Sequence, residues 1–98
     1  MVRNHQDREF VATQLKECLR FVSGKPVSDD IPDGTFVIKE WELDSEHGIE
    51  LACDLSARLG INIPQEDNPL ILEFGASKSK RARTFGEIVD YLLKLGNA

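Results

Sequence analysis

Three segments of this 98-residue chain carry apolar side chains at helical spacing, and a glycine stands just beyond the end of each. They cover residues 7–22, 44–59 and 84–95. Apolar residues that recur every three or four positions line one face of a helix, and glycine readily takes the left-handed conformation that ends it. The pattern predicts three main helices that bury their apolar faces against one another.

The residues that open these segments support the same helices. Asp44 is the predicted N-cap of the second helix, because its carboxylate can accept hydrogen bonds from unpaired amides of the first turn. Thr84 and Glu87 have the spacing of a capping box at the start of the last helix. In the second helix we expect the buried stripe to consist of Ile49, Ala52, Cys53, Leu55 and Leu59.

The segment between the first two helices, residues 25–43, cannot form one continuous helix. Pro26 and Pro32 interrupt it, because proline lacks the amide hydrogen and clashes with the preceding turn. Its apolar residues are nevertheless too many for a free linker. We therefore predict a long ordered loop that Phe36–Ile38 and Trp41 attach to the core.

Two shorter segments and the N-terminus complete the predicted fold. Residues 69–74 are predicted as a short helix or turn, residues 75–83 as a mobile basic loop, and residues 1–6 as a flexible terminus. No segment shows the paired alternation of a sheet. The sequence thus predicts one all-α domain over residues 1–98. It would be a four-helix bundle of three main helices and one short helix, with a long loop between the first two.

Charge and size narrow the possible functions. The chain has 17 acidic and 12 basic residues, for a net charge of −5, which favours basic partners and repels nucleic-acid phosphates. Four of the basic residues fall within residues 78–83, a cluster that is short and lacks aromatic residues. No apolar run is long enough to cross a membrane, and no signal-peptide pattern is present. We therefore expect a cytoplasmic protein.

Reactive side chains are few. Cys18 and Cys53 are 35 positions apart, which predicts two free buried cysteines rather than a metal site or a disulfide framework. Ser45 and His47 are two positions apart on the predicted helix and point in different directions, so they cannot form a catalytic pair. The chain is therefore expected to have no catalytic residues and no metal site.

The second helix and its surroundings resemble the acyl carrier proteins. Asp44-Ser45 opens the helix, as an Asp-Ser pair does in that family, and Ile49-Glu50-Leu51 follows at the family spacing. The helix ends at Leu59-Gly60 before Ile61-Asn62-Ile63-Pro64, which is also similar to the family pattern. The resemblance implies an acyl-carrier-like fold and identifies Ser45 as the central residue.

The flanking segments resemble the same family. Phe36-Val37 corresponds to a Phe-Val pair in the long loop, and Thr84–Val89 is similar to the start of the closing helix. The resemblance covers nearly the whole chain and requires an insertion around residues 75–83. Glu46 departs from the pattern, because the family usually has leucine or another apolar residue directly after the serine, where it helps the modifying transferase to dock.

The resemblance implies a covalent cofactor. Ser45 would carry 4′-phosphopantetheine through a phosphodiester, and an acyl or aminoacyl group would be held on this arm as a thioester. Its partners would be a phosphopantetheinyl transferase and the loading and acyl-transfer enzymes, whose basic patches would dock on Glu46, Glu50 and Asp54. The cargo and its pathway, whether fatty acid, polyketide, peptide or lipid synthesis, are left open.

Two other functions remain open from the sequence. The chain could be an unmodified carrier-like adaptor that binds proteins through the acidic face of the second helix, or the same acids could simply keep that face soluble. A small nucleic-acid-associated protein that uses residues 78–83 is the other alternative, although the acidic composition speaks against it.

Overall fold

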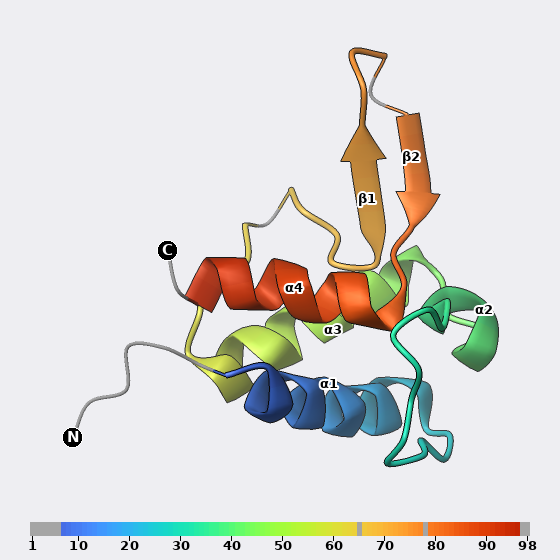
Figure 1. Cartoon of the computed structure of the whole chain (residues 1–98), viewed down its shortest axis with the longest axis vertical. Helices are drawn as coiled ribbons and strands as arrows, with labels where there is room; N and C mark the ends of the chain where they lie inside the picture. Colours follow the sequence, from blue (N-terminus) through green and yellow to red (C-terminus); the bar gives the residue numbers. More distant parts are fainter. Residues whose placement is uncertain (1–6, 65, 78, 97–98) are drawn as a thin grey trace.

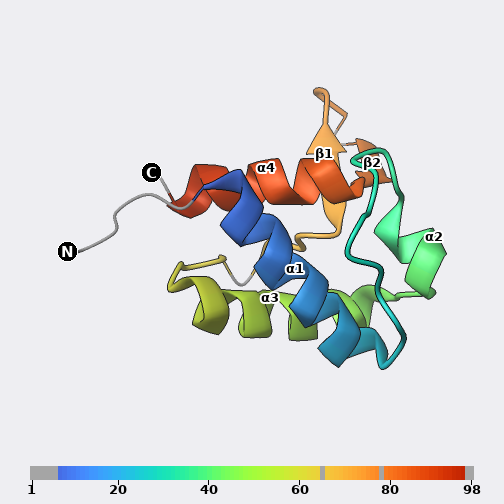
Figure 2. The same cartoon turned by 60° about the horizontal axis from the view of Figure 1, so that its bottom comes forward.

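Three main helices form the body of the protein in the computed structural model, which describes residues 7–64, 66–77 and 79–96. They are α1 (Arg8–Ser23), α3 (Ser45–Leu59) and α4 (Phe85–Gly96). Helix α1 packs against both α3 and α4, so that it lies between them in Figure 2. The three predicted main helices are confirmed.

The predicted ends of the first two main helices are also found. Asp7 is the N-cap of α1, and its Oδ1 accepts a hydrogen bond from the Phe10 amide at 2.8 Å. Gly24 ends α1 with φ 68°, and Gly60 ends α3 with φ 65°. Both glycines take the left-handed conformation that a residue with a Cβ atom adopts only at a steric cost.

The segment between α1 and α3 contains a helix that the sequence did not indicate. Helix α2 (Val37–Trp41) lies within the predicted long loop. Val37 and Trp41 are buried, and the indole Nε1 of Trp41 donates to the carbonyl oxygen of Pro26 at 3.1 Å. Attachment of the segment to the core through these two residues is confirmed, whereas Phe36 is 47 % exposed and does not take part.

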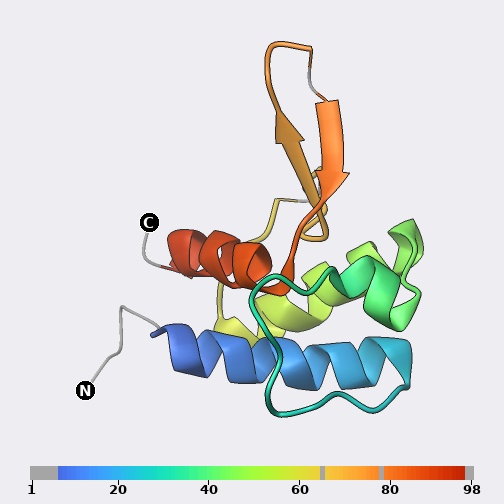
Figure 3. The same ribbon diagram turned by 45° about the vertical axis from the view of Figure 1, so that its right-hand side comes forward.

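An antiparallel hairpin stands away from the helices (Figures 1 and 3). Its strands are β1 (Ile71–Phe74) and β2 (Ser79–Ala82), paired from Ile71 opposite Ala82 to Phe74 opposite Ser79. The predicted all-α fold is therefore wrong, since the described residues form a two-stranded sheet in addition to four helices. Of residues 69–74, expected as a short helix or turn, residues 69–70 form a turn and residues 71–74 form a strand. Residues 75–83 contain the second strand.

Pairing rather than local composition explains this hairpin. A run of four apolar or mixed residues such as β1 cannot be assigned to strand or helix by periodicity. Strand β2 has the sequence Ser-Lys-Arg-Ala, which carries no strand signal of its own. The ladder continues at the base of the hairpin, where the Arg83 amide donates to the Leu70 carbonyl oxygen at 2.8 Å. β2 is thus extended because it satisfies the backbone groups of β1.

The predicted capping box at the start of α4 is confirmed. The Thr84 amide donates to Glu87 Oε1 at 2.9 Å, and the Glu87 amide donates to Thr84 Oγ1 at 3.3 Å. Arg81 of β2 donates to both oxygens of the same carboxylate, with Nη1 to Oε1 at 2.8 Å and Nη2 to Oε2. These hydrogen bonds, those of Arg81 first, lower the pKa of Glu87 to about 2.

We expect the Glu87 carboxyl carbon to titrate near pH 2 and to move toward the ordinary value of 4.5 in Arg81→Gln. Because the pKa is lowered in the folded state, the stability from Glu87 is complete above about pH 4.5 and is lost as the pH falls through about 2. Carbon-13 NMR titration of both proteins measures this midpoint, and Arg20→Gln on α1 is the matched control. An unchanged midpoint in Arg81→Gln would contradict the assignment.

One apolar core holds the helices, the connecting segments and the base of the hairpin together. Cys18 belongs to this core. None of the described residues with a polar or charged side chain is buried in it. Its buried side chains are Val11, Leu15, Cys18, Leu19, Val27, Val37, Trp41, Leu43, Leu51, Leu55, Leu59, Ile63, Leu70, Phe85, Ile88, Val89 and Leu92.

Candidate functional site

The start of α3 is held by reciprocal hydrogen bonds between Asp44 and His47. Asp44 Oδ1 accepts from the amides of Glu46 at 3.0 Å and of His47 at 3.1 Å. In return, the Asp44 amide donates to His47 Nδ1 at 3.0 Å. Asp44 is therefore the N-cap, as predicted, and His47 completes a capping box that the sequence analysis missed.

This arrangement affects the charge at the helix start. The hydrogen bond from the His47 amide is the largest cause that holds the pKa of Asp44 below its ordinary value. A ring nitrogen that accepts a hydrogen bond carries no proton, so Nδ1 of His47 is the unprotonated nitrogen in this geometry. The helix start thus has an ionised carboxylate that stabilises the unpaired amides of the first turn.

Ser45 is the first residue of α3. The side chain of Ser45 lies outside the part of the chain that the structure describes, so the attachment of the cofactor stays a prediction. Residues 1–6 also lie outside it, and the flexible terminus likewise stays a prediction. The backbone position agrees with the sequence analysis, because residue 45 directly follows the N-cap Asp44. A phosphate at such a position is favoured by the positive end of the helix dipole, by about 0.3–1 kcal/mol.

The three acids predicted to bind partners do not have the same environment. Glu46 and Glu50 are exposed. Asp54 is half-buried and forms an ion pair with Arg58, at 2.6 Å between Oδ2 and Nε, with side-chain exposures of 22 % and 28 %. Two of these carboxylates are therefore open to solvent, whereas the third is neutralised within the chain.

The buried face of α3 differs from the prediction. Ile49 is 67 % exposed and Cys53 is exposed, so the expectation that both are buried is wrong. The helix has apolar side chains on two sides, and periodicity does not tell which side meets α1. Tertiary packing places Cys18 of α1 against α3, with Sγ 3.8 Å from the Leu51 carbonyl oxygen. The side that is buried carries Leu51, Leu55 and Leu59.

A groove runs along the exposed apolar side of α3, and we call it the α3 groove. Its volume is about 480 Å³, within the usual range of small-molecule sites. The groove begins at Gly48 and Ile49, one helical turn beyond position 45. On the side of α3 it is lined by Gly48, Ile49, Ala52, Cys53 and Ser56, and on the other side by Ile63, Pro64 and residues 66–68.

Gly48 permits the close approach of the far wall of this groove. A Cβ atom at position 48 would lie 2.4 Å from Oδ1 of Asn68. That oxygen accepts a hydrogen bond from the Leu70 amide at 2.9 Å, so the Asn68 side chain is held in place. A side chain at position 48 would displace Asn68 and with it the segment that leads to β1.

The groove residues were not predicted as site residues. Ile49 and Cys53 were assigned to the core, and Ile63 and Pro64 were used only in the family resemblance. One sequence signal could have revealed them, since the apolar side chains of α3 extend around more of its surface than a single buried stripe requires. Which part of that surface stays open depends on how α1 packs.

Comparisons of the chain with family models, with curated proteins and with solved structures found no match in any of the three.

Two further features are absent from residues 7–64, 66–77 and 79–96. In these segments there is no helix with the length and apolar character needed to span a bilayer. The same segments contain no group of three or more histidine, cysteine, aspartate or glutamate side chains that could hold a metal ion.

Proposed function

We propose that the protein is a carrier that holds an acyl or aminoacyl group as a thioester on 4′-phosphopantetheine attached to Ser45. The observation that supports this most is the α3 groove, because it begins one turn beyond position 45 and offers apolar surface to a flexible chain fixed there. A carrier needs no catalytic groups of its own, since a partner transferase supplies the metal ion and base for the attachment.

The groove suits an attached arm better than a free ligand. Ile49 is an exposed apolar side chain on the same helix as the attachment residue. Each Å² of apolar surface that the arm and this wall remove from water would contribute about 25 cal/mol. A covalent bond at Ser45 would keep the arm at high effective concentration beside the groove.

The helix start also suits basic partners. Glu46 and Glu50 are exposed on α3, and the chain carries a net charge of −5. We infer that the loading and acyl-transfer enzymes dock through basic patches on these two acids, and that a basic patch of the transferase docks on Glu50. Asp54 contributes less, because Arg58 already neutralises it.

Modification of Ser45 is tested by intact-mass spectrometry. After co-expression with a phosphopantetheinyl transferase, we expect the wild type to gain the mass of one phosphopantetheinyl group and Ser45→Ala to gain none. Ser56→Ala is the matched control, since Ser56 lies on the same helix and lines the groove, and it should be modified like the wild type. The proposal would be refuted if the wild type stays unmodified with every transferase tried and also carries no phosphopantetheinyl group when it is isolated from its native host.

Docking is tested by the kinetics of transferase binding. We expect Glu50→Lys to slow association far more than it speeds dissociation, because exposed charges act mainly on the encounter step. The effect should shrink as salt rises, since the screening length is about 8 Å at physiological ionic strength. Glu9→Lys on α1 is the control with the same charge change. A loss that does not depend on salt would contradict docking through Glu50.

A further inference from the structure

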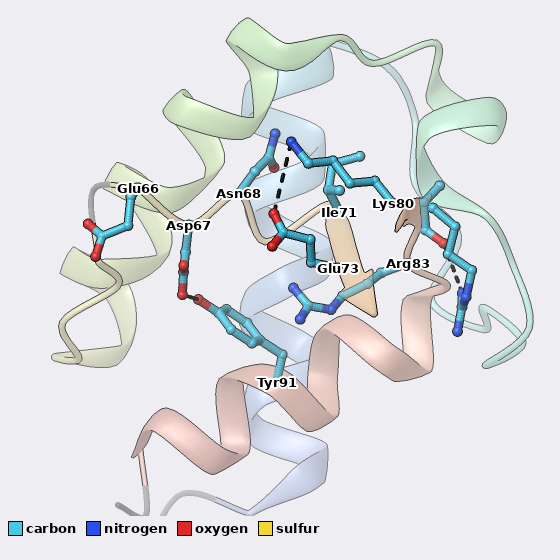
Figure 4. Close-up of a pocket in the computed structure, with 10 residues that line it drawn as sticks. Glu66, Asp67, Asn68, Ile71, Glu73, Lys80, Arg83 and Tyr91 are labelled. Atoms are coloured by element: carbon cyan, nitrogen blue, oxygen red, sulfur yellow. Dashed lines mark hydrogen bonds and ion pairs between the residues drawn. The ribbon is translucent and has the colours of Figure 1, made fainter. Parts of the chain in front are cut away.

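A second cavity lies between the hairpin and α4 (Figure 4). Its volume is about 520 Å³, and residues 66–68 form a wall that it shares with the α3 groove. Ile71 and Glu73 of β1, Lys80 of β2 and Tyr91 of α4 face it. Neither the carrier function nor Ser45 explains why charged groups of both signs gather here.

Arg83 is the unusual residue of this cavity. Its guanidinium carbon lies 4.2 Å from the centre of the Tyr91 ring, and its Nη1 donates to the Pro69 carbonyl oxygen at 3.2 Å. The side chain is half-buried, and this desolvation lowers its pKa. Among the described arginines it alone has no carboxylate at ion-pair distance; those that do are Arg8, Arg20, Arg58 and Arg81.

A half-buried guanidinium that has no carboxylate at ion-pair distance favours an anionic ligand. Arginine presents several N–H donors in a plane that matches the two oxygens of a carboxylate. The Tyr91 ring holds the plane of Arg83 in position, and only Nη1 is used by the Pro69 carbonyl. The remaining donors are therefore available on the cavity side, where Figure 4 shows the guanidinium between Glu73 and Tyr91.

Carboxylates also face the cavity. Asp67 Oδ2 accepts a hydrogen bond from the Tyr91 hydroxyl at 3.0 Å, and Glu73 Oε2 lies 3.9 Å from Lys80 Nζ, a long ion pair. Together with Arg83, these groups line one cavity with both positive and negative charge. They would repel a phosphate dianion and would attract a ligand that carries both an anionic and a cationic group.

We propose that this cavity binds a free amino acid with an aliphatic side chain. Its carboxylate pairs with Arg83 above the Tyr91 ring, and its ammonium group lies between Asp67 and Glu73. The aliphatic side chain contacts Ile71, which lines the same cavity. The site shares the wall of residues 66–68 with the α3 groove, but it does not require modification of Ser45.

Binding is tested with the full chain and four probes, by nitrogen-15 chemical-shift titration and calorimetry. The probes are L-leucine, 4-methylpentanoate without the ammonium group, 3-methylbutylamine without the carboxylate, and inorganic phosphate. We expect saturable shifts at Ala82, Arg83 and Tyr91 with leucine. Each analogue should bind at least tenfold more weakly, because each leaves charged groups of the cavity without a partner.

Substitutions show whether the named side chains are responsible. Arg83→Gln and Glu73→Gln should each weaken leucine binding about tenfold or more, whereas Arg20→Gln on α1 should leave it unchanged. Arg83→Gln loses contacts with Pro69 and Tyr91 and could fail to fold for that reason. Glu73→Gln then serves as the second test, because the Glu73 side chain is exposed. Absence of leucine binding, equal binding of 4-methylpentanoate, preference for phosphate, or wild-type affinity in either variant would overturn the proposal.

Discussion

Replacing Glu46 with leucine is expected to speed modification of Ser45 by a generic phosphopantetheinyl transferase at least tenfold. An enzyme that holds the first turn of the helix in an apolar socket would have to remove water from the exposed Glu46 carboxylate. Desolvating an unpaired ion costs several kcal/mol, and 1.4 kcal/mol already corresponds to a factor of ten. The rate is measured as the increase in modified mass over time.

The helix start should tolerate this change. The hydrogen bond at Glu46 comes from its backbone amide, which donates to Asp44, so the side chain can be replaced without loss of the cap. Glu50→Leu is the matched control, since it also replaces an exposed acid of α3 with leucine. It should not accelerate modification, because Glu50 is proposed to attract the transferase. If the wild type is modified faster than Glu46→Leu, the transferase is a dedicated enzyme with a basic socket. Equal rates would mean that the transferase does not contact the side chain of residue 46.

Truncating Leu92 to alanine is expected to lower the free energy of unfolding by about 2–5 kcal/mol. Leu92 lies on the inner face of α4 and is 1 % exposed, so the removed atoms leave a cavity among core side chains. Domains of this size are stable by only about 5–15 kcal/mol, and the variant should therefore unfold at clearly lower denaturant concentration. Urea unfolding followed by circular dichroism measures the difference.

Phe21→Ala provides the comparison for Leu92. Phe21 lies on α1 but is 69 % exposed, and substitutions at such positions usually change stability by no more than about 0.5 kcal/mol. Equal unfolding midpoints for Leu92→Ala and the wild type would mean that the buried face of α4 has been assigned incorrectly.

The main helices could be predicted because their signals are local. Asp44 precedes the first turn of α3, Gly24 and Gly60 end their helices, and Thr84 and Glu87 bond one another's amides. Each of these features depends on residues a few positions apart, which the sequence displays directly. The large buried side chains of α4, which are Phe85, Ile88, Val89 and Leu92, likewise recur at helical spacing in the sequence.

The candidate site was predictable only in part. The position of Ser45 after the N-cap and the exposure of Glu46 and Glu50 follow from the local helix pattern. The environment of Asp54 does not, because the half-burial of its ion pair with Arg58 depends on what packs beside α3. The α3 groove was missed for the same reason.

What the sequence by itself determined is therefore the set of main helices, their caps and the position of Ser45. Tertiary structure alone decided that Ser79–Ala82 is extended, that Ile49 faces outward, and that Arg83 lies over Tyr91. These outcomes depend on contacts between residues distant in the chain, where packing and pairing override weak local preference. A short polar segment becomes a strand only when a partner strand satisfies its backbone, and an apolar face is buried only where another helix covers it.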